Sequence, residues 1–354
     1  MVRRFAFAVP GDLATPTGGY AYDRRMIAEL QRLDWHADVL GLGDGFPQPS
    51  AEQKSYAEAR LSEVAKDVPI VVDGLAFGAL PEAAEKLQAH TLVALVHHPL
   101  AFETGLKPEV AEMLWTSERV ALAATRHVIV SSPSTAQLLA DDYDVPLERM
   151  TVAPPGTDPA AAQSSGSSDG IVRLVSVGAI VQRKGFDVLI AALAELTDLP
   201  WRLAIAGDRT RDPAAVAALD ADVARHKLGD RVELLGALPQ DRIGALYAGA
   251  DLFVLASRFE GYGMAYAEAI AHGLPVIGTT AGAIPDTVPP EAGVLVEPNE
   301  VKPLVRALRM LIANAEERRW FASGARDVAL RLPTWEDSAK LFARGIEHAI
   351  EAAA

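Results

Sequence analysis

One stretch, residues 252–278, constrains the fold of this chain more than any other. Its apolar run at 252–256 predicts a buried parallel strand, and the Ala-rich sequence from Met264 predicts a helix that Gly273 and Pro275 end. The loop between them therefore lies at the carboxyl end of a strand and the amino end of a helix. In open α/β sheets ligands bind at that place, and the free N–H groups of the helix start favour phosphate.

Two glutamates flank this expected phosphate site. Glu260 lies just before the helix and Glu268 about one turn inside it, while Gly261 and Gly263 let the backbone approach a ligand closely. Beside a diphosphate, carboxylates are useful as acceptors of hydrogen bonds from hydroxyls. A nucleotide sugar has hydroxyls on both sides of its diphosphate. An acidic residue near a helix start is also favourable without any ligand, so capping is the alternative interpretation.

The surrounding sequence, EGYGMAYAEAIAHGLPVI, resembles the E-x7-E signature of the GT4 family of retaining glycosyltransferases, the glycosyl transferases group 1. The resemblance implies a GT-B fold, in which two Rossmann-like doubly wound α/β domains face each other across a cleft. It implies that Glu260 contacts the donor sugar and takes a catalytic part, and that Glu268 contacts the ribose. We place the donor phosphates at the helix start, with Tyr262, Gly263 and Met264.

Composition limits the classes of protein to which the chain could belong. With 354 residues and 50% hydrophobic content, it has enough material for two α/β domains. The absence of cysteine excludes disulfides and fits a reducing cytoplasm. The net charge of −14 argues against nucleic acid as a partner and leaves at most a peripheral contact with the inner face of a membrane. We expect neither a signal peptide nor a membrane-spanning helix.

The domain boundary is predicted at a small, polar segment without periodicity. We expect an amino-terminal, acceptor-side domain at 1–158, a linker at 159–170 and a nucleotide-sugar domain at 171–332. A last helix at 333–354 is expected to cross back to the first domain, as the GT-B architecture implies.

A first strand–loop–helix unit is predicted at 3–33, and Gly18 and Gly19 open its helix. This pair is not a G-x-G-x-x-G fingerprint, so a dinucleotide-dependent oxidoreductase loses its main signal. Paired glycines are also common in plain turns. The resemblance implies that they face the donor phosphate and the acceptor.

Two histidines follow the predicted strand at 91–96. His97 and His98 come at the carboxyl end of a parallel strand, where ligands bind, and imidazole titrates near neutral pH. The family has a histidine in this loop that contacts the transferred sugar. Spacing does not decide between the two; we favour His98, with His97 as a packing or acceptor-side residue.

A second anion site is predicted after the strand at 171–177. Arg183 and Lys184 precede a glycine and a helix, so cations and the helix dipole act on the same phosphate. Ala179 occupies the position where the family has an arginine, so that contact is missing or is supplied by Arg183. The resemblance assigns the base to the backbone of a further strand end, at Gly236, Ala237 and Leu238.

No metal and no other cofactor is expected. The two Asp-x-Asp triplets, at 142–144 and 220–222, follow a helix or lie inside one instead of following an apolar strand. The leaving diphosphate would be stabilised by Arg183, Lys184 and helix-start N–H groups.

The expected function is thus a metal-independent hexosyltransferase that moves a sugar from a nucleotide diphosphate sugar to a hydroxyl of a sugar or glycolipid, in cell-envelope glycan, polysaccharide or glycolipid synthesis. The alternatives are a non-catalytic sugar-nucleotide sensor, a synthase that acts on a free sugar or sugar phosphate, and a GT-B phosphorylase. The donor base, the donor sugar, the acceptor and the oligomeric state leave no signature in the sequence.

Overall fold

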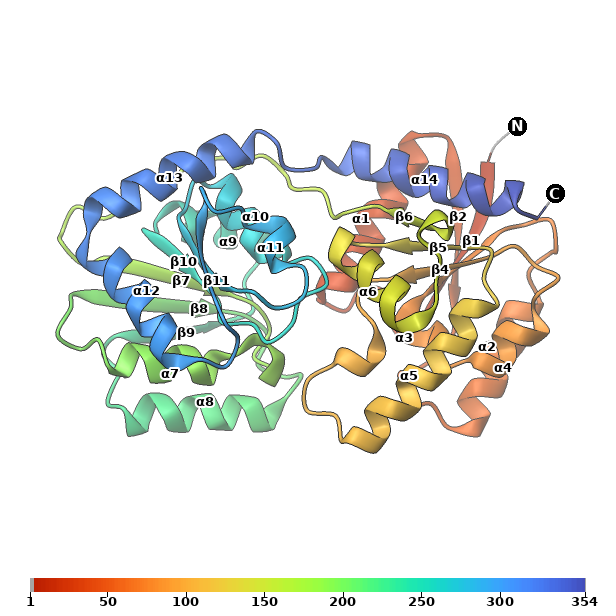
Figure 1. Cartoon of the computed structure of the whole chain (residues 1–354), viewed down its shortest axis with the longest axis horizontal. Coiled ribbons are helices and arrows are strands. Elements are labelled where there is room, and N and C mark those ends of the chain that lie inside the picture. Colours follow the sequence, from red (N-terminus) through yellow and green to blue (C-terminus); the bar gives the residue numbers. More distant parts are fainter. Residues whose placement is uncertain (1–2, 354) are drawn as a thin grey trace. The chain divides into compact units, whose positions relative to one another are not determined.

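The computed structural model describes residues 3–353 and divides the chain into two compact units (Figure 1). Unit 1 contains the described residues up to Gly156 together with those from Pro333 onward, and unit 2 runs from Thr157 to Leu332. The chain therefore passes from one unit to the other twice.

Unit 1 is built on a six-stranded parallel sheet with the order β2-β1-β3-β4-β5-β6. Helices lie on both faces of the sheet, so its central strands are apolar nearly throughout. The strands are β1 (Arg3–Val9), β2 (Trp35–Gly41), β3 (Ile70–Asp73), β4 (Leu92–Val96), β5 (His127–Val130) and β6 (Met150–Val152). The helices are α1 (Gly18–Arg32), α2 (Ala51–Ser62), α3 (Gly74–Phe77), α4 (Pro81–Lys86), α5 (Pro108–Ala123), α6 (Pro133–Tyr143) and α14 (Trp335–Glu351), with short 3-10 turns η1 (Leu100–Phe102) and η2 (Leu147–Arg149).

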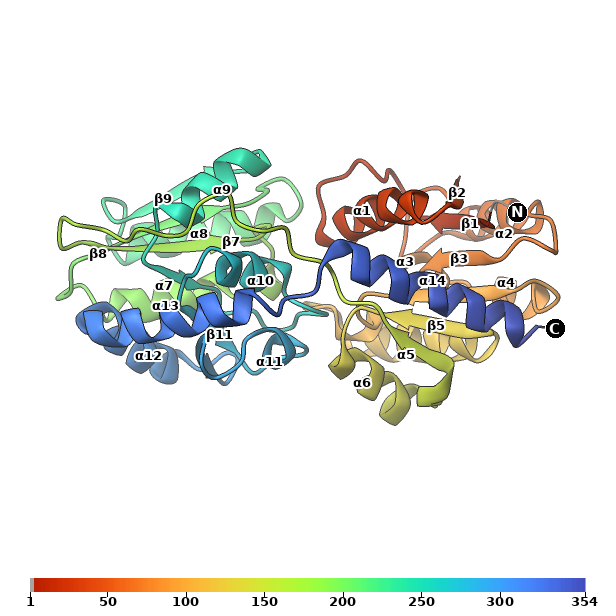
Figure 2. The same ribbon diagram turned by 90° about the horizontal axis from the view of Figure 1, so that it is seen from above.

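Helix α14 completes unit 1 although the whole of unit 2 separates it from the rest of that unit in the sequence. It packs against α1 and against β4, β5 and β6 (Figure 2). The ring of Phe342 stacks on Phe7 with centroids 6.2 Å apart. A Cβ atom at Gly345 would lie 2.8 Å from Ile129, so a glycine is what lets the helix approach the sheet.

Unit 2 has a second six-stranded parallel sheet, with the order β12-β11-β10-β7-β8-β9. Its strands are β7 (Val172–Val177), β8 (Trp201–Ala206), β9 (Val232–Gly236), β10 (Leu252–Val254), β11 (Val276–Thr279) and β12 (Gly293–Val296). Its helices are α7 (Phe186–Ala194), α8 (Pro213–Arg225), α9 (Gln240–Ala248), α10 (Met264–Ala271), α11 (Ile284–Thr287), α12 (Val301–Ala313) and α13 (Ala315–Ala329), and η3 (Gln182–Lys184) is a 3-10 turn.

The strand order of unit 2 reverses between β7 and β10. Two chain segments therefore leave neighbouring strands in opposite directions at this point, which is where doubly wound sheets bind ligands. The loops concerned are those that carry the predicted Arg183–Lys184 and Glu260 motifs. The prediction of two doubly wound α/β domains is thus confirmed.

The polar segment at 159–170 is part of unit 2. Its backbone N–H at Ser164 donates to the carbonyl of His272 at 2.9 Å, and the N–H of Ser167 donates to the Asp251 carboxylate at 2.7 Å. The segment for which composition predicts a linker therefore runs along the surface of the second sheet unit, tied to it by hydrogen bonds.

Candidate functional site

The two loops at the reversal point of unit 2 pack tightly against each other. Gly185 ends the first loop with φ +65°, and a Cβ atom there would lie 1.9 Å from the carbonyl oxygen of Ala256 in the second. The N–H of Arg258 donates to the Arg183 carbonyl at 2.7 Å. This contact brings residues about 75 positions apart into one site.

Glu260 is the centre of this site. Its Oε1 accepts hydrogen bonds from Lys184 Nζ and Ser257 Oγ, both at 2.6 Å, and its Oε2 accepts from Arg183 at 3.0 Å. The residue is 6% exposed. Burial alone would raise the pKa of Glu260, but the charges of Lys184 and Arg183 outweigh it and lower the pKa to about 2.

Arg183 and Lys184, which are half-buried, therefore form one ionic cluster with the buried Glu260, and the three side chains have a formal charge of +1. The Arg183 guanidinium also donates to the carbonyl of Phe259 at 2.7 Å. From the sequence, the two cations are predicted to contact a phosphate and the carboxylate a sugar. The structure brings all three side chains together, and the carboxylate orients the cations through hydrogen bonds. Two cations grouped around one carboxylate make this cluster a candidate site for an anion.

The start of α10 lies directly after this cluster. Gly263 is the N-cap with φ +94° and has no side chain with which to cap the helix, so its first N–H groups need other partners. Met264 begins the helix. Tyr262 is buried, its carbonyl accepts from Thr287 Oγ1 at 2.6 Å, and burial with the nearby charge of Asp286 raises its pKa to about 12.

A third loop fixes the position of Glu260 from the other side. The N–H of Ala283 donates to the Glu260 carbonyl at 2.9 Å, and a Cβ atom at Gly282, which has φ +57°, would lie 2.3 Å from the same oxygen. The backbone of Glu260 is therefore held as firmly as its side chain.

Glu268 has a different environment. It is half-buried one turn inside α10, and its Oε2 accepts a hydrogen bond from the Tyr247 hydroxyl at 3.1 Å. Burial, with a smaller effect of Asp158, raises the pKa of Glu268 to about 7. Unlike Glu260, this carboxylate forms no ion pair with a cationic side chain of residues 3–353, so it keeps acceptor capacity for a hydroxyl group.

The predicted base-binding residues end β9. Gly236 has φ +70°, and no atom lies within 4 Å of the position where its Cβ would be. Its carbonyl accepts from the N–H of Gly207 at 2.8 Å. Ala237 is exposed and Leu238 half-buried, so this strand end is open to a ligand.

In unit 1, the predicted glycines form the first turn of α1. Thr17 caps the helix, its Oγ1 accepting from the N–H of Tyr20 at 3.1 Å, and Gly18 and Gly19 follow. A Cβ atom at Gly19 would lie 3.3 Å from the His97 ring, so a glycine here leaves room for the imidazole.

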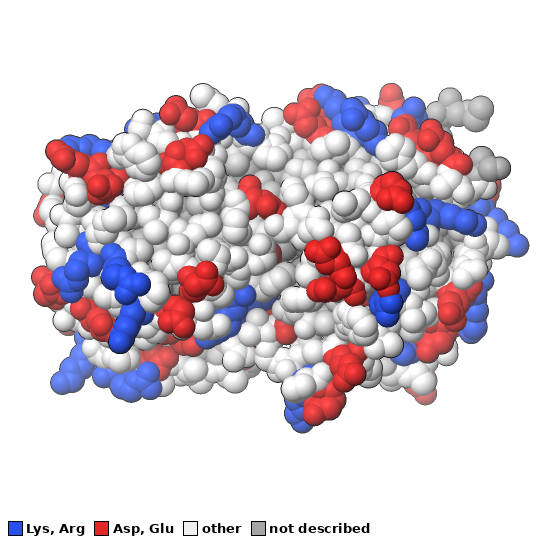
Figure 3. Space-filling view, viewed as in Figure 1, with Lys and Arg blue, Asp and Glu red and all other residues white. Residues whose placement is uncertain are grey.

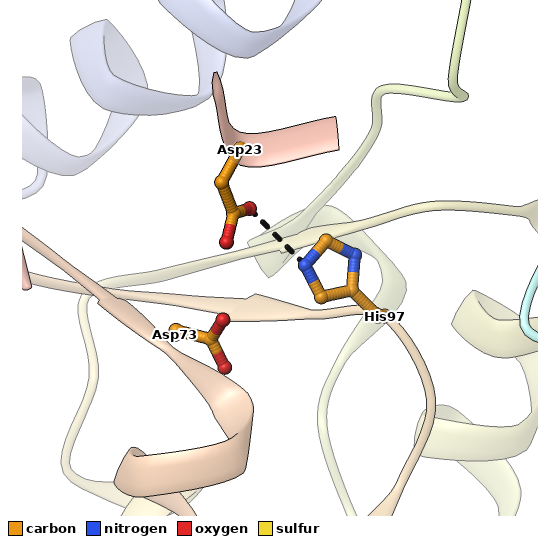
Figure 4. A group of neighbouring side chains, drawn as sticks. All are labelled: Asp23, Asp73 and His97. Atoms are coloured by element: carbon orange, nitrogen blue, oxygen red, sulfur yellow. Dashed lines mark hydrogen bonds and ion pairs between the residues drawn. The ribbon is translucent and has the colours of Figure 1, made fainter. Parts of the chain in front are cut away.

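The two histidines of the following loop take different places. His97 lies inside unit 1, where its Nε2 contacts Asp23 Oδ1 at 3.2 Å (Figure 4). Its ring packs edge-on against Tyr22. His98 Nε2 lies 3.4 Å from Glu103 Oε2, and both side chains are partly exposed. The preference for His98 over His97 stays a prediction.

Asp73 joins His97 and Asp23. The three side chains offer ligand atoms within 4.8 Å of one another, close enough to share a proton or a cation. Burial, together with the charge of Asp23, raises the pKa of Asp73 to about 7. Burial opposes protonation of His97, but the two carboxylates raise its pKa above the ordinary value.

Sequence reasoning missed several residues of these sites. Asp73 is the last residue of a buried strand, so the rule that selected His97 would also have selected it. Asp23 lies within a helix and looks like a solvated charge. Arg211 lies on the loop after β8, and its charge acts on Lys184. That loop adjoins the Arg183 loop, since the N–H of Ile180 donates to the Asp208 carbonyl at 2.8 Å.

Acidic and basic side chains are interspersed on the face that Figure 3 shows. Across residues 3–353, no helix is both long enough and apolar enough to traverse a bilayer.

Two family models match the chain. The model for glycosyl transferases group 1 matches residues 159–328, and that for glycosyltransferase family 4 matches residues 39–161. Together they match residues 39–328, which include parts of both units.

Curated relatives carry related names. The MMP alpha-(1->4)-mannosyltransferase of Mycolicibacterium hassiacum is 28% identical, with 86% of this chain and 76% of the relative aligned. The D-inositol 3-phosphate glycosyltransferase of Xylanimonas cellulosilytica is 29% identical over 71% of this chain, which spans 63% of that relative.

Solved structures share the fold at low identity. Sucrose-phosphate synthase from Thermosynechococcus elongatus matches with a TM-score of 0.79 and 20% identity, covering 96% of this chain and 98% of that one. Anabaena HepE in complex with UDP-glucose matches with a TM-score of 0.75 and 20% identity over 97% and 99% of the two chains. The predicted α/β architecture of the GT-B type is confirmed.

Proposed function

Because the chain belongs to the group 1, family 4 type of glycosyltransferases, we propose that it transfers a sugar from a nucleotide diphosphate sugar to an acceptor hydroxyl, with retention at the anomeric carbon and without a metal ion. The observation that carries the proposal is the cluster of Arg183, Lys184 and Glu260, at the reversal point of the sheet and before the start of α10. Two half-buried cations beside helix-start N–H groups suit a diphosphate.

The two glutamates then have separate roles. Glu260 orients Lys184 and Arg183 toward the phosphates. It also keeps acceptor capacity for a hydroxyl of the donor sugar, because a carboxylate has about four lone-pair sites and the hydrogen bonds from Lys184, Arg183 and Ser257 occupy three. Glu268 accepts from the ribose, and the strand end at Gly236–Leu238 borders the base. The complex of HepE with UDP-glucose supports a nucleotide-sugar donor for this fold.

The reaction breaks the bond between the anomeric carbon and the diphosphate oxygen and forms one to the acceptor oxygen. The acceptor proton passes to the departing phosphate, on the same face. Arg183, Lys184 and the α10 N–H groups stabilise the charge that develops on the leaving diphosphate, an electrostatic contribution that is commonly the largest one in catalysis. Glu260 orients the donor sugar and does not attack it.

The donor is identified by thermal unfolding of the purified chain with UDP, GDP, ADP and their sugars, because a ligand at ~100 Kd stabilises the folded state by about 2.7 kcal/mol. We expect one nucleotide to raise the melting temperature and Lys184→Ala to remove the effect. Lys302→Ala is the matched control, since Lys302 is an exposed lysine of the same unit.

Transfer is then measured with the donor so found, against a panel of sugar, sugar phosphate and glycolipid acceptors, and the anomeric configuration of the product is read by NMR. Retention with full activity in EDTA is the expected result. Nucleotide binding without hydrolysis or transfer would identify a sensor instead, and activity that EDTA abolishes and Mn²⁺ restores would refute the role given to the cations. Glycan synthesis at the cell envelope and a cytoplasmic location stay proposals.

A further inference from the structure

We propose that Asp23 and Asp73 are positioning residues that share one proton and thereby hold His97 as an imidazolium with a fixed orientation. The three side chains come from α1, from the end of β3 and from the residue after β4 (Figure 4). The role of these three side chains toward substrate rests on the proposed function, whereas their protonation does not.

The first step concerns the two carboxylates. Asp23 is fully buried and Asp73 is 2% exposed, and their oxygens lie within 4.8 Å of each other. Two negative charges at that separation, away from water, cannot both persist without a counter-charge for each, so one carboxyl keeps a proton.

The second step decides which carboxyl is protonated. Asp73 Oδ1 accepts the N–H of Leu75 at 2.7 Å, while Asp23 Oδ1 is in contact with His97. Asp23 Oδ2 is buried without a hydrogen-bond partner, and in Figure 4 it faces Asp73. A proton on Asp73 Oδ2 would supply the missing donor, whereas a proton on Asp23 would weaken the contact with His97. Asp73 is therefore the neutral member and Asp23 the ionised one.

The third step concerns His97. Its Nε2–H donates to Asp23, its ring packs edge-on against Tyr22 with centroids 5.1 Å apart, and its carbonyl accepts from Ser131 Oγ at 2.9 Å. The second ring nitrogen faces away from both carboxylates (Figure 4), and the side chain is 21% exposed. The imidazolium therefore presents its Nδ1–H as a charge-assisted donor for a substrate oxygen.

Other titratable groups around the ring do not compete for this role. Tyr22 donates its hydroxyl to the Ala153 carbonyl at 2.9 Å, and burial, with the charge of Asp23, raises its pKa well above the ordinary value, so it stays neutral. His98 has its own carboxylate, Glu103. The charge of the Asp23 carboxylate and that of the imidazolium cancel, and Asp73 is neutral. The three side chains together therefore carry no net charge, which suits their burial.

The test compares two isosteric variants. Asp73→Asn replaces the neutral acid by an amide that can still donate to Asp23, whereas Asp23→Asn removes the charge that His97 faces. The primary readout is the NMR titration of the histidine side chains, in which His97 is assigned by its loss in His97→Gln. We expect Asp73→Asn to leave the proton affinity of His97 within about 3-fold and Asp23→Asn to lower it at least ~10-fold. Asp12→Asn, at an exposed aspartate of the same unit, is the control.

Activity gives a second readout if the chain transfers sugar. Asp23→Asn is expected to lose ~100-fold or more in kcat, the range in which positioned proton donors act, with its pH profile shifted to lower pH, whereas Asp73→Asn is expected to keep the pH profile of the wild type. If Asp23→Asn does not fold, infrared spectra decide, because the difference spectrum between the wild type and Asp73→Asn at neutral pH must contain the band of one further protonated carboxylic acid in the wild type.

Equal effects of the two substitutions on His97 would overturn the proposal, and so would a stoichiometric divalent metal in the purified wild type that both variants lose. If His97 titrates as expected but no sugar is transferred, the proposed function fails and the proton-sharing unit stands. If transfer occurs and His97 titrates as an ordinary histidine, the proposed function stands and the proton sharing between Asp23 and Asp73 fails.

Discussion

Replacing Glu260 by Gln tests the central cluster of unit 2 most directly. The substitution keeps the shape of the side chain but removes the carboxylate charge that the half-buried Arg183 and Lys184 share. The pKa of Glu260 is lowered from 4.5 to about 2, and such a shift corresponds to about 3 kcal/mol of stabilisation. Removing one partner of a buried ion pair has a similar cost, about 3–5 kcal/mol. For a unit of this size we expect the melting temperature of Glu260→Gln to fall by roughly 6–12 °C at neutral pH.

The dependence on pH has a definite sign. Because the folded-state pKa of Glu260 is depressed, its contribution is complete above the unfolded value of 4.5 and is lost as the pH falls through about 2. The difference in the free energy of unfolding between wild type and Glu260→Gln should thus be constant above pH 5 and should become smaller below it.

Glu260→Gln should raise the affinity for nucleotide although it lowers the stability of the free protein. A diphosphate can replace the carboxylate as counter-ion of Arg183 and Lys184, and it no longer meets the negative charge of Glu260. At a separation of ~7 Å and an effective dielectric constant of ~20, the repulsion removed is about 2 kcal/mol. We expect Glu260→Gln to bind the nucleoside diphosphate ~10- to 30-fold more tightly while sugar transfer is abolished.

Differential scanning calorimetry at several pH values, with and without nucleoside diphosphate, measures all three quantities. Glu233→Gln is the control, because Glu233 is an exposed glutamate of β9 in the same unit. A Glu260→Gln protein that unfolds at the wild-type temperature at pH 7 and binds nucleotide with unchanged affinity would refute the reasoning.

Three further predictions concern single residues. Glu118 is buried, accepts from the N–H of Leu100 at 2.9 Å, and has its pKa raised by burial to about 8. The free energy of unfolding should therefore fall as pH rises from 4.5 to 8, by up to about 5 kcal/mol. In urea titrations of Glu118→Gln, the unfolding free energy should depend less on pH than in the wild type. Because the pKa of Glu268 is about 7, donor affinity measured by calorimetry should rise between pH 6 and 8. Glu268→Gln should remove this rise, and it should also remove the loss of affinity that the wild type shows for a donor whose ribose lacks its hydroxyls. Gly185→Ala, whose Cβ would lie 1.9 Å from the Ala256 carbonyl, should cost about 2 kcal/mol or more in thermal unfolding and weaken nucleotide binding, whereas Gly229→Ala, with open space around it, should do neither.

The fold followed from local patterns because each unit repeats one of them. Apolar runs such as 252–256, each followed by a glycine loop and a helix, predict parallel strands and crossover helices without knowledge of distant contacts. The glycine positions also carried information, since Gly185 and Gly263 have positive φ and only the loops that they form bring the charged residues to the sheet reversal.

The pairing of charges could not be predicted in the same way. Arg183 and Glu260 are 77 positions apart, and their contact depends on the order β10-β7, which the sequence pattern does not specify. Asp23 shows the same limit more sharply, because an aspartate in an amphipathic helix is commonly solvated and here is fully buried. Its partners belong to two other strand ends, so local sequence has no signal for it.

The return of the chain at Pro333 has a consequence for biosynthesis. A ribosome releases the first 156 residues long before α14, so the sheet side that Phe342 and Ile346 will cover stays unprotected throughout the synthesis of unit 2. Unit 2, being uninterrupted in sequence, has all its residues earlier and can finish folding first, as domains commonly do during translation. A released chain that ends at Leu332 should therefore bind chaperones through unit 1 and not through unit 2.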